Sequence, residues 1–360
     1  MKLKPSAALT VLLFLLLFWG GMGISLPATA TVGLVASGIM LTLAFAANGS
    51  KLNKPLGFYS YLAFLAVISA SFLRGGLGVE GKYFLALFLG GGAFWLGFYN
   101  LQKSFSGKLT NIIILLGVIF GVMLVGYMLL GEIPVRGWNL YLFSSIYRNH
   151  NHIGDLWALV EIVAVYRIIK TKKWYWWALG LAGIFFLAVS LSRSAYVAFF
   201  AGAAFLTFKE KWSKKYSKLL IPVLVAPVLL FLGAGLFKTT LYSRLYFLQG
   251  LLGLFRHPLG VGLGNFAQVS NEAGNILSIN AKAALAHNIV LEVVVGVGVL
   301  GIFFIVWLLK VLVDLFKRGD ILYSALFVAL TVNFFFDTTY YIPAMIWLWF
   351  VLLGLAQARK

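Results

Sequence analysis

The sequence has no cysteine and few charged residues. Across 360 residues only 11% are charged, and aspartate and glutamate together number 10. The absence of cysteine excludes disulfide and thiolate chemistry, and the shortage of charge excludes a water-soluble domain. Hydrophobic residues make up 62% of the chain. We therefore expect lipid rather than water to surround most of this fold.

Common signatures of metal and nucleotide binding are missing as well. The sequence has no Asp-x-Asp pair and no His-Glu-x-x-His motif. His150 and His152 stand two residues apart, but a zinc site would need further ligands that the sequence does not identify. Gly260, Gly262 and Gly264 imitate a dinucleotide fingerprint, yet no strand precedes them. Metal-independent chemistry without a cofactor is predicted.

Apolar segments near or above the length of a bilayer recur along the chain. A helix rises about 1.5 Å per residue, so about 20 apolar residues cross about 30 Å of hydrocarbon. We predict an all-α integral membrane protein, one polytopic domain over residues 1–360, with about 12 transmembrane helices. Their expected positions are 7–24, 27–47, 56–73, 83–101, 109–130, 153–170, 174–191, 194–208, 219–237, 287–309, 321–338 and 341–356.

The formal net charge is +19, and the positions of the basic residues along the chain indicate its cause. With a cytoplasmic N-terminus, most of the 29 lysines and arginines fall in the inner connections, and the densest run lies at 209–218. This asymmetry is the positive-inside signal of a membrane protein rather than the footprint of a nucleic-acid-binding surface. Both termini are expected in the cytoplasm, membrane lipids are expected partners, and nucleic acid is not.

Two outer connections are long, at about 131–152 and 238–286. The second one, between the ninth and tenth predicted helices, is the expected periplasmic loop. In it, Leu241, Leu245, Leu248 and Leu252 recur at helical spacing before the breaker-rich segment RHPLGVGLGNF. We predict short helices that form a cap on the membrane surface.

Histidine and most arginine gather on the predicted outer face, whereas the inner positive charge is mostly lysine. The residues are His150, His152, His257 and His287, with Arg74, Arg136, Arg148, Arg193, Arg244 and Arg256. Topology signals need only charge, but the planar guanidinium can hold a phosphate through two hydrogen bonds. An arginine-rich outer face therefore suggests an anionic ligand. The alternative for any single arginine is that it caps a helix or reaches toward the interface.

Arg193 interrupts nearly continuous apolar sequence in the segment SLSRS, between the seventh and eighth predicted helices. A charge at such a tight turn next to lipid is either paired or functional. Asp337 and Glu292 are its candidate partners. Glu161 is expected near the middle of the sixth helix, either as a neutral, hydrogen-bonded packing residue or in a functional role.

His287 and Asn288 open the tenth predicted helix directly after a polar loop. An imidazole at this interface could serve as a general base near neutral pH. The alternative is a structural histidine that caps the helix or lies at the membrane interface. The arginines expected on the same face favour the catalytic interpretation.

Four segments between about 140 and 310 follow each other in a known order. They are RNHNHIGDLWAL, SLSRSAYVAFF, SRLYFLQGLLGLFRHPLGVGLGNF and AHNIVLEVVVGVGVLG. With about twelve helices and a long outer loop before the tenth, the chain resembles the O-antigen ligase and O-antigen polymerase superfamily of bacterial envelope glycosyltransferases. The chain is short for that family and its long loop is compact.

The resemblance implies a mostly helical enzyme of the bacterial inner membrane, with its active site on the periplasmic face. The donor would be a glycan on undecaprenyl pyrophosphate, transferred with inversion to a lipid or glycan acceptor without metal or nucleotide sugar. His287 would be the catalytic base. Arg193 and Arg244 would bind the pyrophosphate, and Asn288 and His152 would line the pocket.

Alternatives remain open at the level of the sequence. A ligase would transfer the glycan to lipid A–core, a polymerase would extend another lipid-linked glycan, and relatives act on proteins. A transporter or flippase for lipid-linked sugars is the competing class. Transporters tend to show repeated halves and charged sites near the midplane, whereas here the halves do not resemble each other and only Glu161 lies deep.

Overall fold

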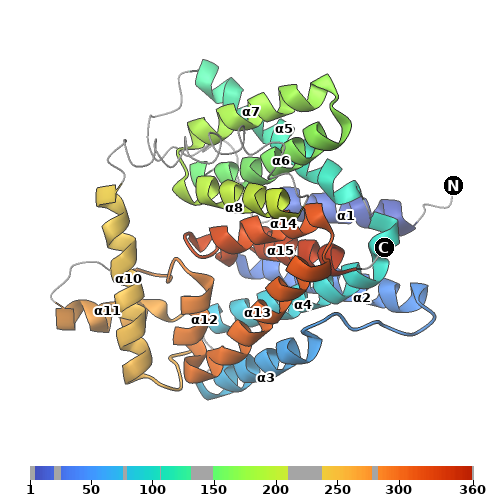
Figure 1. Cartoon of the computed structure of the whole chain (residues 1–360). Coiled ribbons are helices and arrows are strands. Elements are labelled where there is room, and N and C mark those ends of the chain that lie inside the picture. Colours follow the sequence, from blue (N-terminus) through green and yellow to red (C-terminus); the bar gives the residue numbers. More distant parts are fainter. Residues whose placement is uncertain are drawn as a thin grey trace.

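The structure is a computed structural model that describes residues 5–19, 26–75, 79–105, 107–130, 149–209, 237–277 and 283–358. In this part of the chain every regular element is a helix (Figure 1), so the all-α prediction is confirmed. The α-helices are α1 (Pro5–Trp19), α2 (Leu26–Ala47), α3 (Phe58–Gly75), α4 (Val79–Phe105), α5 (Lys108–Leu129), α6 (His150–Thr171), α7 (Trp174–Ser190), α8 (Arg193–Lys209), α10 (Phe237–Arg256), α11 (Phe266–Leu277), α12 (Ile289–Val297), α13 (Ile302–Arg318), α14 (Ile321–Asn333) and α15 (Pro343–Gln357). Two 3₁₀ turns, η2 (Gly298–Gly301) and η3 (Thr338–Tyr341), complete the set.

Several of these helices are long and apolar enough to cross a membrane. Within the described residues there are 4 such spans, at Ala28–Ala47, Glu80–Leu101, Lys108–Leu129 and Ile289–Arg318. Shorter apolar helices stand at Phe58–Ser71, Trp174–Ser190, Ile321–Asn333 and Pro343–Gln357. The structure therefore supports a helical membrane protein. The predicted number of about twelve crossings stays a prediction, and residues 219–236 of the ninth predicted helix lie outside the described residues.

The tenth helix, predicted at 287–309, is interrupted in the structure. The α-helix α12 stops at Val297, a 3₁₀ turn follows, and α13 then runs on to Arg318. The break falls where Gly298 adopts a φ of 69°, a left-handed conformation that glycine accepts without steric cost. Apolar composition alone does not reveal the break, because the sequence is apolar on both sides of it.

Residues of the breaker-rich segment RHPLGVGLGNF make backbone hydrogen bonds across this break. The amide nitrogens of Val261 and Gly262 donate to the carbonyls of Val295 and Gly296, at 3.1 and 2.8 Å. In return, the Val299 amide donates to the carbonyl of Pro258 at 2.9 Å. A break inside lipid would otherwise leave backbone groups unsatisfied. The loop thus supplies the hydrogen bonds that the interrupted helix lacks.

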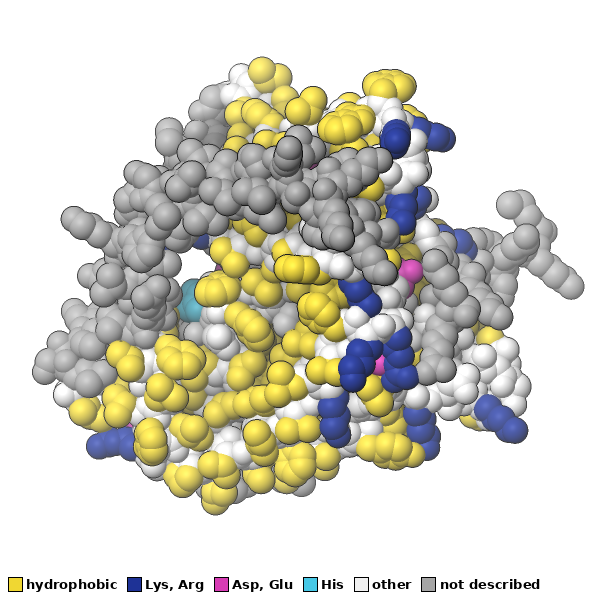
Figure 2. All heavy atoms as spheres, viewed as in Figure 1, with side chains coloured by type: hydrophobic (Ala, Val, Ile, Leu, Met, Phe, Trp, Pro, Cys, Tyr) yellow, Lys and Arg dark blue, Asp and Glu magenta, His cyan; other side chains and the backbone are white. Residues whose placement is uncertain are grey.

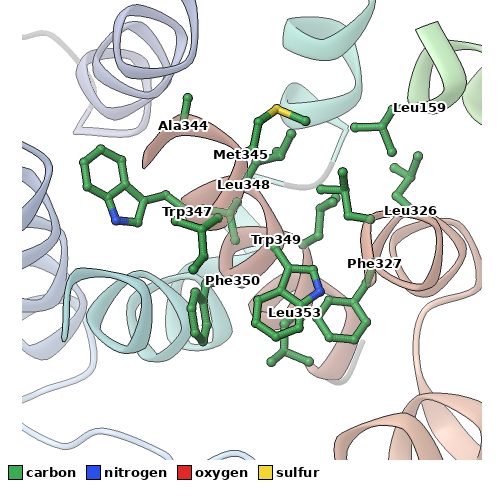
Figure 3. Close-up of a cluster of buried hydrophobic side chains, with 14 of the residues drawn as sticks. Leu159, Leu326, Phe327, Ala344, Met345, Trp347, Leu348, Trp349, Phe350 and Leu353 are labelled. Carbon is green, nitrogen blue, oxygen red and sulfur yellow. The ribbon is translucent and has the colours of Figure 1, made fainter. Parts of the chain in front are cut away.

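Helix α15 forms the centre of the bundle and is buried on all sides. Figure 3 shows its side chains reaching toward several neighbouring helices. The Trp349 ring stacks on Phe327 at 5.0 Å between centroids, and its indole nitrogen donates to the Thr331 hydroxyl at 2.8 Å. Trp347 lies against Gly33 of α2, where a side chain would have no room. A helix that is hydrophobic all round is expected in such a position.

Helices α10 and α11 belong to the predicted outer loop and lie at the left edge of the bundle in Figure 1. A helix is thus present where the leucine spacing predicts one. The face that packs is a different one: Leu248 is 51% exposed, whereas Gly250 lies against Leu291 of α12 and Gly253 against Val269 of α11. Small residues let the helices approach closely, and this contact fixes α10 over the start of α12.

Charged side chains are unevenly spread over the visible surface. Figure 2 shows most of the visible lysine and arginine side chains at the right, and a histidine side chain in a hollow at the left. Helices α10 and α11 lie toward the same left side in Figure 1.

Candidate functional site

The segment that opens α12 is held in place by its neighbours. The side-chain oxygen of Asn288 accepts from the Leu291 amide at 3.0 Å, which makes Asn288 the N-cap. Its amide group donates to the Phe335 carbonyl at 3.2 Å, and the Ile289 amide donates to Phe334 at 2.9 Å. Because Asn288 does the capping, the imidazole of His287 is not needed for it. The capping role considered for His287 is thus filled by Asn288.

His287 itself is half-buried and has an unusual backbone conformation. Its φ of 52° lies in the left-handed region, which a non-glycine residue adopts only where its surroundings enforce it. The ring stacks on Tyr246 of α10, with 5.4 Å between centroids and 16° between planes. Burial lowers the pKa of the imidazole from its usual 6.5, and the nearby carboxylate of Asp337 opposes that shift. At neutral pH the ring is thus in its basic, uncharged form.

Asp337 connects this histidine to the turn that carries Arg193. Helix α7 ends at Ser190, Leu191 adopts a left-handed φ of 51°, and α8 begins at Arg193. The next residue, Ser194, donates its hydroxyl to Asp337 Oδ2 at 3.1 Å. The other carboxylate oxygen caps η3 by accepting from the Thr338 amide at 2.6 Å. Asp337 thus binds the Arg193 turn directly, and its charge acts on the imidazole through space.

A second buried carboxylate, Asp155, lies in the first half of α6 and is 1% exposed. Its Oδ1 accepts from the side-chain amide of Asn333 at 2.6 Å, and its Oδ2 accepts from the Thr339 hydroxyl at 2.9 Å. Asp155 and Asp337 are close enough for their charges to repel each other. Neutral donors from α14 and η3 thus hold the start of α6 against the same region of the site.

Glu292 supports the site from the first turn of α12. Its Oε2 accepts from the Ala286 amide at 2.8 Å and from the Tyr340 hydroxyl at 3.1 Å. The amide belongs to the residue that precedes His287, so this carboxylate fixes the backbone that carries the imidazole. Asp337 and Glu292, the predicted partners of Arg193, both have neutral donors, and Asp337 reaches the Arg193 turn through Ser194.

The structure brings several predicted site residues into one region. His287 and Asn288 are consecutive at the start of α12, and Arg193 is half-buried at the start of α8, next to the serine that binds Asp337. His152 is half-buried in the first turn of α6, three residues before Asp155. Arg244 stands on α10, two residues before the tyrosine that stacks on His287. The structure describes the backbone of Arg244 but not its side chain.

Two other histidines have structural contacts. The Nδ1 atom of His150 lies 2.8 Å from the Ser190 carbonyl and joins the start of α6 to the end of α7. His257 hydrogen-bonds Glu272 at 2.8 Å, and this bond lowers the pKa of that carboxyl group. Among the residues that the structure describes, no three His, Asp or Glu side chains form a group that could hold a metal ion.

Three residues of this region were not singled out from the sequence. Asp155 lies inside the segment RNHNHIGDLWAL. It could have been found because a carboxylate in an apolar helix is unusual, and this chain has only 10 acidic residues. Tyr246 and Tyr340 gave no such signal, because this chain has 16 tyrosines. Only the folded arrangement places one on His287 and the other on Glu292.

Glu161 lies deeper, between α6 and α7, and is 3% exposed. Its Oε2 fills the space beside Gly183, where a Cβ would come within 2.0 Å of it. That oxygen has no hydrogen-bond partner among the described residues. In the described structure this oxygen is therefore packed but not hydrogen-bonded, in contrast to the hydrogen-bonded packing role considered from the sequence.

Comparison with known proteins adds no relative. No protein-family model matches the chain, and a search of curated proteins finds no significant match.

Proposed function

We propose that this chain is a membrane glycosyltransferase that transfers a glycan from undecaprenyl pyrophosphate to an acceptor hydroxyl. The observation that carries the proposal is the position of His287. The ring is half-buried and stacks on Tyr246, and the charge of Asp337 acts on it. Asn288, rather than His287, caps the helix. Such a ring is suited to take a proton at neutral pH, because its basic form predominates there.

In the proposed reaction the acceptor oxygen forms a bond to the anomeric carbon as its proton passes to the His287 imidazole. The bond between that carbon and the pyrophosphate oxygen breaks, and its electron pair leaves with the pyrophosphate. Attack from the opposite side inverts the sugar. Negative charge grows on the leaving group, and Arg193 and Arg244 would stabilise it where water is scarce. His152 and Asn288 would line the pocket.

The resemblance to the O-antigen ligase and polymerase superfamily gives the proposal its substrate class. It also implies the bacterial inner membrane, with the site on the periplasmic face and both termini in the cytoplasm. A ligase-like reaction on a lipid acceptor is the first form of the proposal. Polymerisation, in which the acceptor is another lipid-linked glycan, uses the same chemistry and differs only in the acceptor.

The test is transfer by the purified protein in liposomes, with undecaprenyl-pyrophosphate glycan, candidate acceptors and a chelator. His287→Ala and Arg193→Ala are each expected to slow transfer by about 10²-fold or more. His257→Gln is the matched control, because that outer histidine contacts Glu272 rather than His287 or Asp337. If the glycan crosses the liposome membrane but is not transferred to an acceptor, the protein is a transporter and the proposal of an enzyme is wrong.

A further inference from the structure

A cleft of about 580 Å³ opens between the start of α3 and the end of α13. Its polar lining comes from Lys54, Tyr59, Ser60, Tyr99, Lys310, Asp314, Arg318 and Gln357. Several of these residues stand in or beside connections that the charge pattern assigns to the cytoplasm. The cleft therefore belongs to the opposite end of the bundle from His287.

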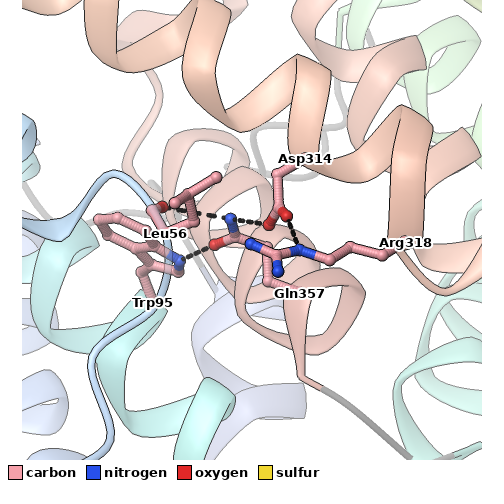
Figure 4. A network of polar contacts seen from close by, with 5 residues as sticks. All are labelled: Leu56, Trp95, Asp314, Arg318 and Gln357. Atoms are coloured by element: carbon pink, nitrogen blue, oxygen red, sulfur yellow. Dashed lines mark hydrogen bonds and ion pairs between the residues drawn. The ribbon is translucent and has the colours of Figure 1, made fainter.

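The floor of the cleft is a buried hydrogen-bonded network, drawn in Figure 4. Gln357 of α15 accepts from the Trp95 indole nitrogen at 2.9 Å and donates to Asp314 at 2.7 Å and to the Leu56 carbonyl at 3.2 Å. Arg318 donates to the other oxygen of Asp314. Four segments far apart in the sequence are joined here, which gives the cleft a fixed shape.

The charges around the cleft do not cancel. The ammonium group of Lys54 donates to the Tyr59 hydroxyl at 2.8 Å, and that of Lys310 donates to the Ser60 hydroxyl at 2.9 Å. Asp314 is the one carboxylate in the described lining, and Arg318 already neutralises it. Two lysine charges thus remain over an open cleft with only neutral partners. An anionic ligand would be attracted to them.

Apolar surface adjoins the charged surface. Leu309, Val313 and Phe316 follow one another at helical spacing on α13, and each is at least half exposed. Lys310 and Asp314, which line the cleft, stand on the neighbouring side of the same helix. Leu56 at the mouth of the cleft is exposed as well. A ligand that combines a negative head with hydrocarbon chains would match both surfaces.

We propose that this cleft binds the phosphate of an anionic phospholipid of the inner leaflet, with the acyl chains along the exposed side of α13. The lysines supply the charge, and the tyrosine and serine hydroxyls supply further hydrogen-bond donors. Basic pockets beside membrane helices on the cytoplasmic side recognise lipid headgroups in this way. The site is independent of the proposed transfer reaction.

The test is native mass spectrometry of the full chain in detergent with phosphatidylglycerol, phosphatidylcholine or inorganic phosphate. The wild type is expected to bind phosphatidylglycerol in preference to phosphatidylcholine, and Lys54→Gln/Lys310→Gln to weaken that binding roughly tenfold or more. Lys108→Gln/Lys173→Gln is the matched control, because both lysines lie over aromatic rings outside the cleft. Each single cleft variant is expected to lose several-fold.

Two results would overturn the proposal. Equal binding of phosphatidylglycerol by the wild type and the cleft double variant would show that the lysines do not hold the lipid. Displacement of phosphatidylglycerol by millimolar inorganic phosphate, with no preference for the lipid, would identify free phosphate as the ligand. An unchanged unfolding temperature of the double variant without lipid shows that its loss of binding does not come from misfolding.

Discussion

The region around Asp337 and the cleft around Lys310 hold ionisable groups in opposite ways. Near Asp337 the carboxylates are buried and each accepts hydrogen bonds from neutral donors. At the cleft the lysines are exposed and their charges are not neutralised by any carboxylate of the described lining. The first arrangement fixes positions and suits chemistry at one atom. The second attracts a ligand and tolerates variation in its position.

The largest expected difference concerns activity. His287→Ala should reduce glycan transfer by about 10² to 10⁴-fold, the range expected for loss of a general base. Lys54→Gln/Lys310→Gln, assayed in liposomes without anionic lipid, should leave the transfer rate close to that of the wild type. A loss of similar size in both variants, measured as initial rates, would mean that the two ends act as one functional unit.

The second difference concerns stability. Asp155→Ala would leave the donors of Asn333 and Thr339 buried without an acceptor, which should cost about 3 kcal/mol of unfolding free energy. Asp155→Asn should cost much less, because its amide oxygen can still accept from Asn333 and its amide nitrogen can donate to the Thr339 hydroxyl oxygen.

Lys310→Ala is the matched change at the exposed end and should lie within about 0.5 kcal/mol of the wild type. The measurement is equilibrium unfolding in mixed micelles. Equal losses for Asp155→Ala and Lys310→Ala would contradict the contrast between the two regions.

The third difference is a pH dependence. Because burial lowers the pKa of His287, transfer should be constant above neutral pH and fall as the ring is protonated, with a midpoint below 6.5. The Asp337 carboxylate raises that pKa, so Asp337→Asn should move the midpoint to still lower pH. The control is Glu272→Gln, which removes a carboxylate that is hydrogen-bonded to His257, and it should leave the midpoint of the pH profile unchanged. A shift toward higher pH in pH–rate profiles would contradict the assignment.

The smallest expected effect is that of salt. Raising ionic strength from about 0.1 to 1 M shortens the screening length from about 10 to 3 Å. Phosphatidylglycerol binding at the exposed lysines should weaken several-fold, whereas the unfolding free energy contributed by the Asp155 contacts should hardly change. Lipid titrations at both salt concentrations provide the measurement. Salt-independent lipid binding would show that the cleft does not act through its charges.

The helices of this fold are largely predictable, because apolar length is a strong signal. Helix α6, for example, starts three residues before its predicted position and α7 starts where expected. The break after Val297 was not predicted, because it depends on hydrogen bonds to a loop 34 to 41 residues earlier. Long-range backbone contacts of this kind leave no periodic trace in the sequence.

The site was predictable to the extent that its residues are chemically rare. His287, Arg193 and Asp337 stand out among apolar neighbours. In the structure Asp337 binds the Arg193 turn through Ser194, and its charge acts on His287. The role of Asn288 as the cap could have been inferred from its position three residues before Leu291. The stacking of Tyr246 on His287 could not, since it requires the placement of α10 over α12.

The closed break between α12 and α13 has a consequence for how the protein is made. Segment Ile289–Arg318 is apolar enough throughout to enter the bilayer as one continuous helix. Its break is complete only when Pro258, Val261 and Gly262 reach it, and these residues leave the ribosome earlier. The break can therefore be completed only after this loop and the later segment have come into contact. The backbone that carries His287 is accordingly set in a late step of assembly, after insertion.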